Sequence, residues 1–366
     1  MNILLAGRLG RYADRVLAMS GRGHRLVYCT LPAPTQKPLP DDLKDDSIPR
    51  YVLSPGTAGR RVAQLVAEYD IDVVYSMKNV WDGSLELTGE MLDAGVGNVV
   101  RHYKEHFCQP SELERRTLTG TAGQIYINEE SLAYFRDVHD VDPATAHVLE
   151  TDFLPARYVG DDFRPKLYDT DHQPHLLVAG GVSVTGGRTD IRELCATMIR
   201  REVHVHIYGA KFVGPNDRGV WGVDHAEARA AYDSLTASGY VHLHGHVDPP
   251  RFVAEWSGYD AGLLHVAASG GHDEPFQRMN HPNRVSPYVA AGLPLAQQDG
   301  RQASIRRMIG RAGIGLVYRN FDDLADQLAD RAELARMSER VRAARPAFTY
   351  EFHVDKLLDI LARYAK

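Results

Sequence analysis

The segment His281–Ala296 (HPNRVSPYVAAGLPLA) has the residue types of a phosphate-binding helix start. Asn283 is suited to cap a helix, and Gly292 and Pro294 are suited to end it. Arg284 would then lie in the first turn, where free N–H groups and a cation attract a phosphate. The residues alone equally fit an ordinary helix of an α/β domain with Arg284 in solvent.

Two glycine-rich segments follow short apolar runs. Gly7-Arg8-Leu9-Gly10 follows the run Asn2–Ala6, and Gly180–Arg188 (GGVSVTGGR) follows the run His175–Ala179. Glycines let the backbone approach a ligand closely, although they also simply shape tight turns. Neither segment is a G-x-G-x-x-G fingerprint or a P-loop.

Three histidines, His242, His244 and His246, alternate along the chain. A strand would place all three on one face, where they could bind zinc. Further acidic or histidine ligands would have to come from elsewhere in the chain. We expect no metal here, and we expect His246, which follows Gly245, to lie in a loop.

Strand and helix patterns alternate in both halves of the chain, which predicts parallel sheets with crossover helices. The predicted strands are Asn2–Ala6, His24–Thr30, Tyr51–Leu53, Asp72–Ser76, Asn98–Arg101, Gln124–Asn128, His175–Ala179, Val203–Tyr208, Tyr240–Leu243, Ala261–Val266 and Gly313–Val317. The pattern lapses between Glu150 and Pro174, which indicates a linker. A long polar helix is predicted at Leu324–Arg340, and an amphipathic helix ends the chain at His353–Tyr364. The prediction is an α/β protein with two open parallel sheets in series.

The composition narrows the class of protein. The 366 residues suffice for two domains, and 44% hydrophobic with 25% charged residues is typical of a globular protein. A formal charge of −6 argues against a nucleic-acid partner. Cys29, Cys108 and Cys195 are far apart, which fits a reducing compartment. No apolar run fits a signal peptide or a membrane span, so a cytoplasmic protein is expected, while a peripheral membrane contact and the oligomeric state stay open.

Several motifs in matching order resemble the GT-B glycosyltransferases, the retaining family 4 type most closely. PNRVSPYVAAGLPLA resembles their P-N-K-x-x-E-Y-x-A-x-G-x-P-V-V segment, and HLLVAGGVSVTGGRTD resembles their first C-terminal strand with its glycine loop. The resemblance to this family extends to three more segments: YVHLHGHVDPPRFVAEWSGYDAGLLHV, the N-terminal ILLAGRLGRYADRVLAMSGRGHRLVYCT and the tail FTYEFHVDKLLDILARY. The resemblance implies two Rossmann-like domains facing a cleft, with residues 1–155 binding the acceptor, 170–345 binding the donor, and 346–366 forming a helix that crosses back to the N-domain.

The resemblance also implies a function. It indicates transfer of a sugar from a nucleoside-diphosphate sugar to a hydroxyl or other acceptor, small molecule or glycan, with retention and without a catalytic metal or other cofactor. The departing phosphate would take the acceptor's proton, and the protein would supply positioning and positive charge. An inverting enzyme would instead need a base such as His106 or Glu105. A nucleotide-sugar 2-epimerase and a non-catalytic partner protein are the alternatives.

Site residues carry over from the matching motifs. Arg284 takes the place of the motif cation on the donor phosphates, with Asn283 and Val285 beside it. Gly181 stands where the family has a cation, and Arg188 is the nearest replacement. His246 falls near the base, and Gly10 falls in the first loop. Two further positions concern the sugar and the acceptor: Glu274 resembles a sugar-binding glutamate, and His106, with His102 and Lys104 as competitors, resembles a cleft histidine. Pro287 replaces the second glutamate of the motif, which suggests an unusual donor sugar.

Overall fold

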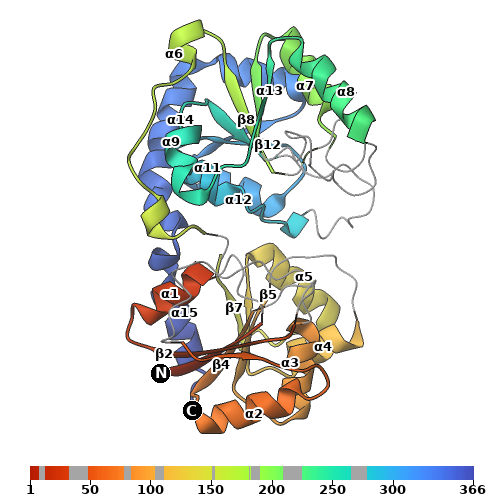
Figure 1. The fold of residues 1–366 in the computed structure, drawn as a ribbon, viewed down its shortest axis with the longest axis vertical. Coiled ribbons are helices and arrows are strands. Elements are labelled where there is room, and N and C mark those ends of the chain that lie inside the picture. The colour runs from red at the N-terminus through yellow and green to blue at the C-terminus, as the bar shows by residue number, and fades with distance from the viewer. Residues whose placement is uncertain are drawn as a thin grey trace. The chain divides into compact units, whose positions relative to one another are not determined.

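The computed structural model describes residues 1–7, 13–32, 48–77, 84–103, 111–150, 153–180, 182, 190–208, 225–264 and 278–366 (Figure 1). The chain forms two compact units. The first unit comprises Met1–Thr151 together with Tyr350–Lys366, and the second comprises Asp152–Thr349. In the described residues, no helix is both long enough and apolar enough to cross a membrane.

The first unit is built on a parallel sheet. Within the described residues its strand order is β3-β2-β1-β4-β5-β6-β7. The strands are β1 (Asn2–Ala6), β2 (Arg25–Thr30), β3 (Arg50–Val52), β4 (Val73–Met77), β5 (Val99–Tyr103), β6 (Gly123–Tyr126) and β7 (Ala146–Val148). The order reverses between β1 and β4, and in Rossmann-like folds ligands bind beyond the carboxyl ends of the strands at such a point.

Helices cover both faces of this sheet. One face carries α2 (Ala58–Glu68), α3 (Ser84–Asp93), α4 (Glu112–Thr119) and α5 (Glu129–His139), which pack against one another in turn. Ser111 caps the start of α4, because its hydroxyl accepts a hydrogen bond from the Glu114 N–H at 3.1 Å. On the other face, α1 (Ala13–Ser20) packs against α15 (Tyr350–Ala362) (Figure 1).

The predicted return of the C-terminal helix to the first domain is confirmed. The Arg22 guanidinium pairs with the Asp355 carboxylate at 2.7 Å, and the Tyr364 hydroxyl lies 2.8 Å from His147 Nε2. The apolar side of α15 is buried in the structure: Val354, Leu357, Leu358, Ile360 and Leu361. An amphipathic helix at the end of the chain therefore completes the N-terminal unit.

The second unit contains another parallel sheet, whose order within the described residues is β10-β9-β8-β11-β12-β13. The strands are β8 (His175–Ala179), β9 (His204–Tyr208), β10 (Val241–His244), β11 (Ala261–Leu263), β12 (Leu295–Gln298) and β13 (Gly315–Tyr318). The helices are α6 (Tyr168–Asp171), α7 (Arg192–Arg200), α8 (His225–Thr236), α9 (Phe252–Trp256), α11 (Val285–Ala290), α12 (Ala303–Ala312), α13 (Phe321–Ala329) and α14 (Arg331–Ala344), with short 3-10 turns η3 (Ala156–Tyr158), η4 (Pro249–Arg251) and η5 (Arg345–Phe348). The predicted fold class, two Rossmann-like parallel-sheet domains, is confirmed.

One face of the second sheet packs into the apolar core. Alternate residues of β8 and β9, such as Leu176, Val178, Val205 and Ile207, are fully buried there with side chains of α7 and α13. Because side chains alternate across a strand, the intervening residues of β8, β9 and β10 point to the opposite face. That opposite face is strongly polar.

Several element predictions were wrong. The predicted single helix Leu324–Arg340 is two helices, α13 and α14, separated at Asp330. The Asp330 side chain accepts a hydrogen bond from the Glu333 N–H at 3.0 Å and so starts a new helix. The three-residue strand β7, the short helix α6 and the helix α12 were not predicted. Cys29 and Cys195 are buried free thiols, and Cys108 lies outside the described residues.

Candidate functional site

The segment that carries Arg284 forms the short helix α11 between β11 and β12. The helix begins one residue later than predicted, with Arg284 itself at the N-cap position and without a side-chain cap. The predicted Asn283 cap is therefore wrong. Its physical reason is the turn at Pro282, whose carbonyl accepts the Val285 N–H at 3.0 Å. Pro287 falls in the first turn, where a missing N–H is tolerated.

The end of α11 follows the prediction. Gly292 adopts φ +72°, a left-handed conformation that favours glycine. The N–H groups of Gly292 and Leu293 donate to the carbonyls of Val289 and Tyr288 at 2.9 Å each, which is the Schellman pattern. All six residues of α11 are buried, so the helix is fixed firmly within the second unit.

Arg284 lies against the glycine that follows β8. A Cβ atom placed on Gly180 would lie 3.1 Å from Arg284 Nη2 and 3.4 Å from its Cζ. Gly180 also has φ +101°, and its N–H donates to the Tyr208 carbonyl at 3.0 Å. Glycine thus serves here both for its backbone conformation and for the close approach of the guanidinium. The contact joins α11 to the carboxyl end of β8, the edge at which this fold class binds ligands.

Tyr288 connects Arg284 with the ends of two strands. Its hydroxyl accepts the Ala179 N–H at 2.7 Å and lies 3.4 Å from the Leu263 carbonyl, to which it can donate. Burial raises the pKa of the Tyr288 hydroxyl, and the nearby Arg284 opposes that rise. Burial lowers the pKa of Arg284, and a hydrogen bond with Tyr288 partly offsets this. A guanidinium keeps its charge in proteins, so the strand ends carry a partly buried cation.

The other predicted site residues are only partly described. His106, Glu274, Gly10, Gly181 and Arg188 lie outside the described residues. Of the remaining three, Asn283 is exposed. Val285 is fully buried, and its N–H is already bonded to the Pro282 carbonyl. His246 lies beyond β10 with 80% of its side chain exposed, 3.5 Å from Asp248 Oδ1. The prediction that His246 lies in a loop after Gly245 is confirmed, because β10 ends at His244, and the strand carries His242 and His244 on one face.

In the first unit, His102 belongs to a buried hydrogen-bond network with a structural role. The ring is buried on β5, with Nδ1 2.5 Å from the Tyr75 hydroxyl and 3.4 Å from Arg15 Nη1. Arg15 also donates to the Tyr75 hydroxyl at 2.8 Å. This network joins α1 to β4 and β5, so it fixes the helix on the sheet. Lys104 and Glu105, which were considered with it, lie outside the described residues.

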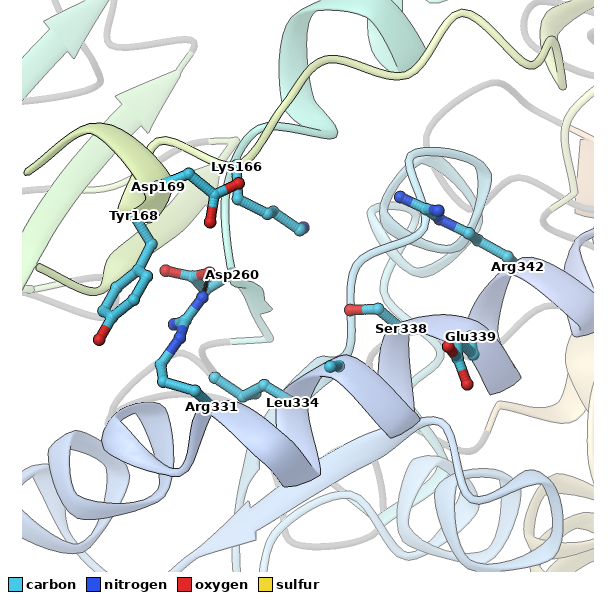
Figure 2. A pocket seen from close by; sticks show the side chains of 10 residues that line it. Lys166, Tyr168, Asp169, Asp260, Arg331, Leu334, Ser338, Glu339 and Arg342 are labelled. Atoms are coloured by element: carbon cyan, nitrogen blue, oxygen red, sulfur yellow. Dashed lines mark hydrogen bonds and ion pairs between the residues drawn. The ribbon is translucent and has the colours of Figure 1, made fainter. Parts of the chain in front are cut away.

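A cavity of about 360 Å³ lies elsewhere in the second unit, between α6 and α14 (Figure 2). Arg331 donates to the Asp260 carboxylate at 2.7 Å, and this carboxylate also accepts the His175 N–H at 2.7 Å. Lys166 Nζ bonds to the Ser257 carbonyl at 3.0 Å, and burial lowers its pKa to about 8. Because Asp260 precedes β11, the cavity opens at the amino edge of the sheet, opposite Arg284. Lys166, Asp260 and Arg331 in its lining are engaged within the chain, which indicates a structural role for these charges.

Sequence reasoning missed Tyr288, and it singled out the glycine-rich segment that begins at Gly180 without indicating that Gly180 would lie against Arg284. Tyr288 stands within the quoted motif PNRVSPY, but its position gave no indication that the hydroxyl would reach β8. It also missed that His175, His204 and His206 lie beside His242 and His244. The alternation in VHVHIY was a usable signal, since it matches the alternation in VHLH.

Comparison with known proteins supports the fold. Residues 225–360, a little over a third of the chain, match the family model described as glucosyltransferase 3-like, C-terminal domain. A glycosyltransferase from Rickettsia africae superimposes with a TM-score of 0.71 at 10% identity, covering 99% of this chain and 98% of that one. A comparison with curated protein sequences gives no match.

Two further solved structures carry nucleotides. HepE from Anabaena in complex with UDP has a TM-score of 0.68 at 12% identity, with 99% and 100% of the chains covered. The UDP-GlcNAc 2-epimerase from Neisseria meningitidis bound to UDP-GlcNAc has a TM-score of 0.58 at 11% identity, with the same coverage. At these identities the likeness defines the fold, and that fold is GT-B.

Proposed function

We propose that this protein is a glycosyltransferase that uses a nucleoside-diphosphate sugar, with the diphosphate bound at the carboxyl edge of the second sheet. The observation that carries the proposal is the Arg284 guanidinium packed against Gly180 at the end of β8. The contact puts a partly buried cation beside a backbone that has no side chain in the way. A diphosphate fits both features, because it needs positive charge and close approach to N–H groups.

The proposed chemistry follows from the leaving group. Negative charge develops on the nucleoside diphosphate as the sugar leaves, and a cation fixed in a site of low dielectric stabilises that charge without reorganising. Tyr288 is a positioning residue in this scheme, because it holds Arg284 relative to β8 and β11. No catalytic metal or other cofactor enters the scheme. Retention of configuration, with the departing phosphate taking the acceptor's proton, belongs to the same proposal.

Further residues extend the donor site in this proposal. Asn283, Val285, Gly181 and Arg188 would line the diphosphate, and His246 would lie towards the base. In the described segment, exposure favours Asn283 and His246 as contacts with a ligand, whereas the buried side chain of Val285 disfavours it. Glu274 is assigned to the donor sugar, and the roles of His106 and Gly10 stay predictions from the sequence.

A second candidate is a nucleotide-sugar 2-epimerase. A UDP-GlcNAc 2-epimerase shares the fold over the whole chain, and a diphosphate cradle would serve either reaction. The two reactions differ in product, since an epimerase converts its nucleotide sugar without an acceptor and without releasing free nucleotide at each turnover.

The experiment incubates the purified chain with UDP-glucose, UDP-GlcNAc and the corresponding GDP- and TDP-sugars, with and without a panel of glycan acceptors. Released nucleoside diphosphate and epimerised donor are measured separately by anion-exchange chromatography. We expect acceptor-dependent release of nucleoside diphosphate, which is lost in Arg284→Met and kept in Arg311→Met, where the substituted arginine is exposed. Epimerised donor without nucleotide release would instead identify the second candidate, and turnover unchanged in Arg284→Met would refute the assigned site.

A further inference from the structure

Five histidines cover one face of the second sheet across three neighbouring strands. They form what is called here the histidine array: His175 on β8, His204 and His206 on β9, and His242 and His244 on β10. The register places His175 beside His204 and His206 beside His242. The rings of His175 and His204 stack with centroids 4.7 Å apart, and those of His206 and His242 stack at 4.5 Å.

Imidazole nitrogens link the array into two hydrogen-bonded rows. In one row, His175 Nδ1 lies 2.9 Å from His206 Nε2, and His206 Nδ1 lies 3.0 Å from His244 Nε2. In the other row, His204 Nδ1 lies 2.9 Å from His242 Nε2. At one end of the two rows, the Nε2 atoms of His175 and His204 therefore take no part in the hydrogen bonds between the rings.

The two Nε2 atoms meet one carboxylate at that end. Asp171 Oδ2 lies 3.0 Å from His175 Nε2 and 3.7 Å from His204 Nε2, and the ligand atoms of the three residues all lie within 4.8 Å of one another. Asp171 is fixed by the Gln173 N–H, which donates to its Oδ1 at 3.0 Å. Gln173 Oε1 lies 2.6 Å from His204 Nε2, so a neutral oxygen also borders the cluster.

We propose that Asp171, His175 and His204 form a binding site for a divalent transition metal, with Zn²⁺ as the preferred ion. Tetrahedral Zn²⁺ holds nitrogen and oxygen ligands at 2.0–2.2 Å, so neighbouring ligand atoms lie about 3.3 Å apart. The observed separations of 3.0 and 3.7 Å lie on either side of that value. Gln173 Oε1 or water completes the fourth position.

The rest of the array supplies the supporting shell of such a site. A metal-bound imidazole usually donates its other ring N–H to a polar partner, which fixes its orientation. His206 and His242 offer Nε2 acceptors to His175 Nδ1 and His204 Nδ1. With a metal on both ligand Nε2 atoms, His175, His206 and His204 each carry a proton on Nδ1 and donate it to the next ring of the row. Each neutral ring keeps one proton, and the hydrogen bonds between the rings persist, whereas bonds to the metal replace the contacts of the two ligand Nε2 atoms with Asp171 and Gln173.

The site is accessible and separate from the proposed donor site. The Asp171 side chain is 38% exposed, whereas His175 is 5% exposed, so solvent reaches the cluster from the carboxylate side. The ligands lie before or at the start of β8 and β9, at the amino edge of the sheet. Arg284 and Gly180 lie at the carboxyl edge. The inference therefore does not depend on the proposed transferase activity, and a metal here joins α6 to the strands that follow it.

The test uses the full chain, stripped with a chelator and titrated with Co²⁺, whose visible absorption reports coordination number. We expect one Co²⁺ per chain with the intense bands of a four-coordinate site, and displacement of Co²⁺ by one equivalent of Zn²⁺. Asp171→Asn and His204→Gln should weaken Zn²⁺ binding at least tenfold. His206→Gln, which removes a supporting contact without touching the metal, should weaken it by about 10–100-fold.

His172→Asn is the matched control, because His172 is exposed, adjoins Asp171 and has φ +62°, a conformation that asparagine tolerates. Its Zn²⁺ affinity should equal that of the wild type. Circular dichroism and thermal melting of each stripped variant verify that it folds. Two results would overturn the proposal: no saturable Co²⁺ binding by the folded wild type, or an affinity unchanged in folded Asp171→Asn and His204→Gln.

Discussion

Replacing Tyr288 with phenylalanine removes one oxygen atom from the centre of the second unit. The ring is fully buried, and its hydroxyl accepts the Ala179 N–H at 2.7 Å. Strand β11 is too short to pair with this part of β8, because its register with β8 covers only Ala261 and Gly262. The hydroxyl therefore replaces the missing strand partner of Ala179.

The expected loss of stability follows from the Ala179 N–H, which loses its hydrogen-bond acceptor. A buried N–H left without an acceptor costs about 1–3 kcal/mol. For a unit of this size, 1 kcal/mol corresponds to about 2–4 °C in melting temperature, so Tyr288→Phe should lower that temperature by roughly 2–12 °C. The ring also packs against Gly262, where an added Cβ would lie 2.4 Å from Tyr288 Cδ2. Phenylalanine keeps this packing, so the loss reports on the hydroxyl.

Differential scanning calorimetry with urea denaturation measures the effect, and Tyr126→Phe is the control. Tyr126 is also fully buried, but its hydroxyl has no hydrogen-bond partner among the described residues. Its removal should be neutral or stabilising. Tyr288→Phe should in addition weaken UDP binding, because Arg284 loses a hydrogen bond that positions it. Equal stability and equal UDP affinity in Tyr288→Phe and the wild type would refute this account of Tyr288.

Three further predictions concern the second unit. Gly180→Ala should destabilise the protein by about 1–2 kcal/mol in urea denaturation and weaken UDP binding, because a side chain is strained at φ +101° and meets Arg284; unchanged affinity would argue against the cradle. Lys166 has its pKa lowered from 10.5 to about 8, so the unfolded chain binds more protons between these values and stability should rise with pH from about 8 to 10.5 by about 3 kcal/mol; a rise that persists in Lys166→Met would contradict this origin. Asp330→Ala should cost about 1 kcal/mol through the lost cap on the Glu333 N–H, with Asp330→Asn restoring most of it in thermal melts; no loss in the alanine variant would show that the cap does not hold α14.

Sequence patterns predicted the fold well because it is built from local periodicity. Strand runs bounded by glycines, and helices with one apolar side, predicted two parallel sheets in series. The element predictions that were wrong also have physical causes. A polar helix pattern gives no indication that Asp330 will cap a second helix rather than continue the first. Within the described residues, strand β7 pairs with β6 alone, and its three residues lack the apolar run of a central strand.

The sequence predicted the charged residue of the candidate site, but it did not predict the residues that hold this side chain in place. Arg284 was recognisable from the order of Asn283, Gly292 and Pro294 around it. Its position against Gly180 depends on the packing of α11 against β8, a strand more than a hundred residues earlier in the chain, which no local pattern encodes. The histidine array illustrates the same limit, because alternation within β9 and β10 shows a common face, whereas their side-by-side register with His175 arises only from the strand order.

Isothermal titration of UDP against wild type and Arg284→Met tests the central claim, that the carboxyl edge of the second sheet binds a diphosphate at Arg284. A charge-assisted hydrogen bond contributes about 1.5–3 kcal/mol, so we predict that UDP binds the wild type with one site per chain and binds folded Arg284→Met about 10–100-fold more weakly. Arg311→Met should bind as the wild type does. Equal affinity in wild type and Arg284→Met, or no binding of any nucleoside diphosphate to the wild type, would contradict the claim.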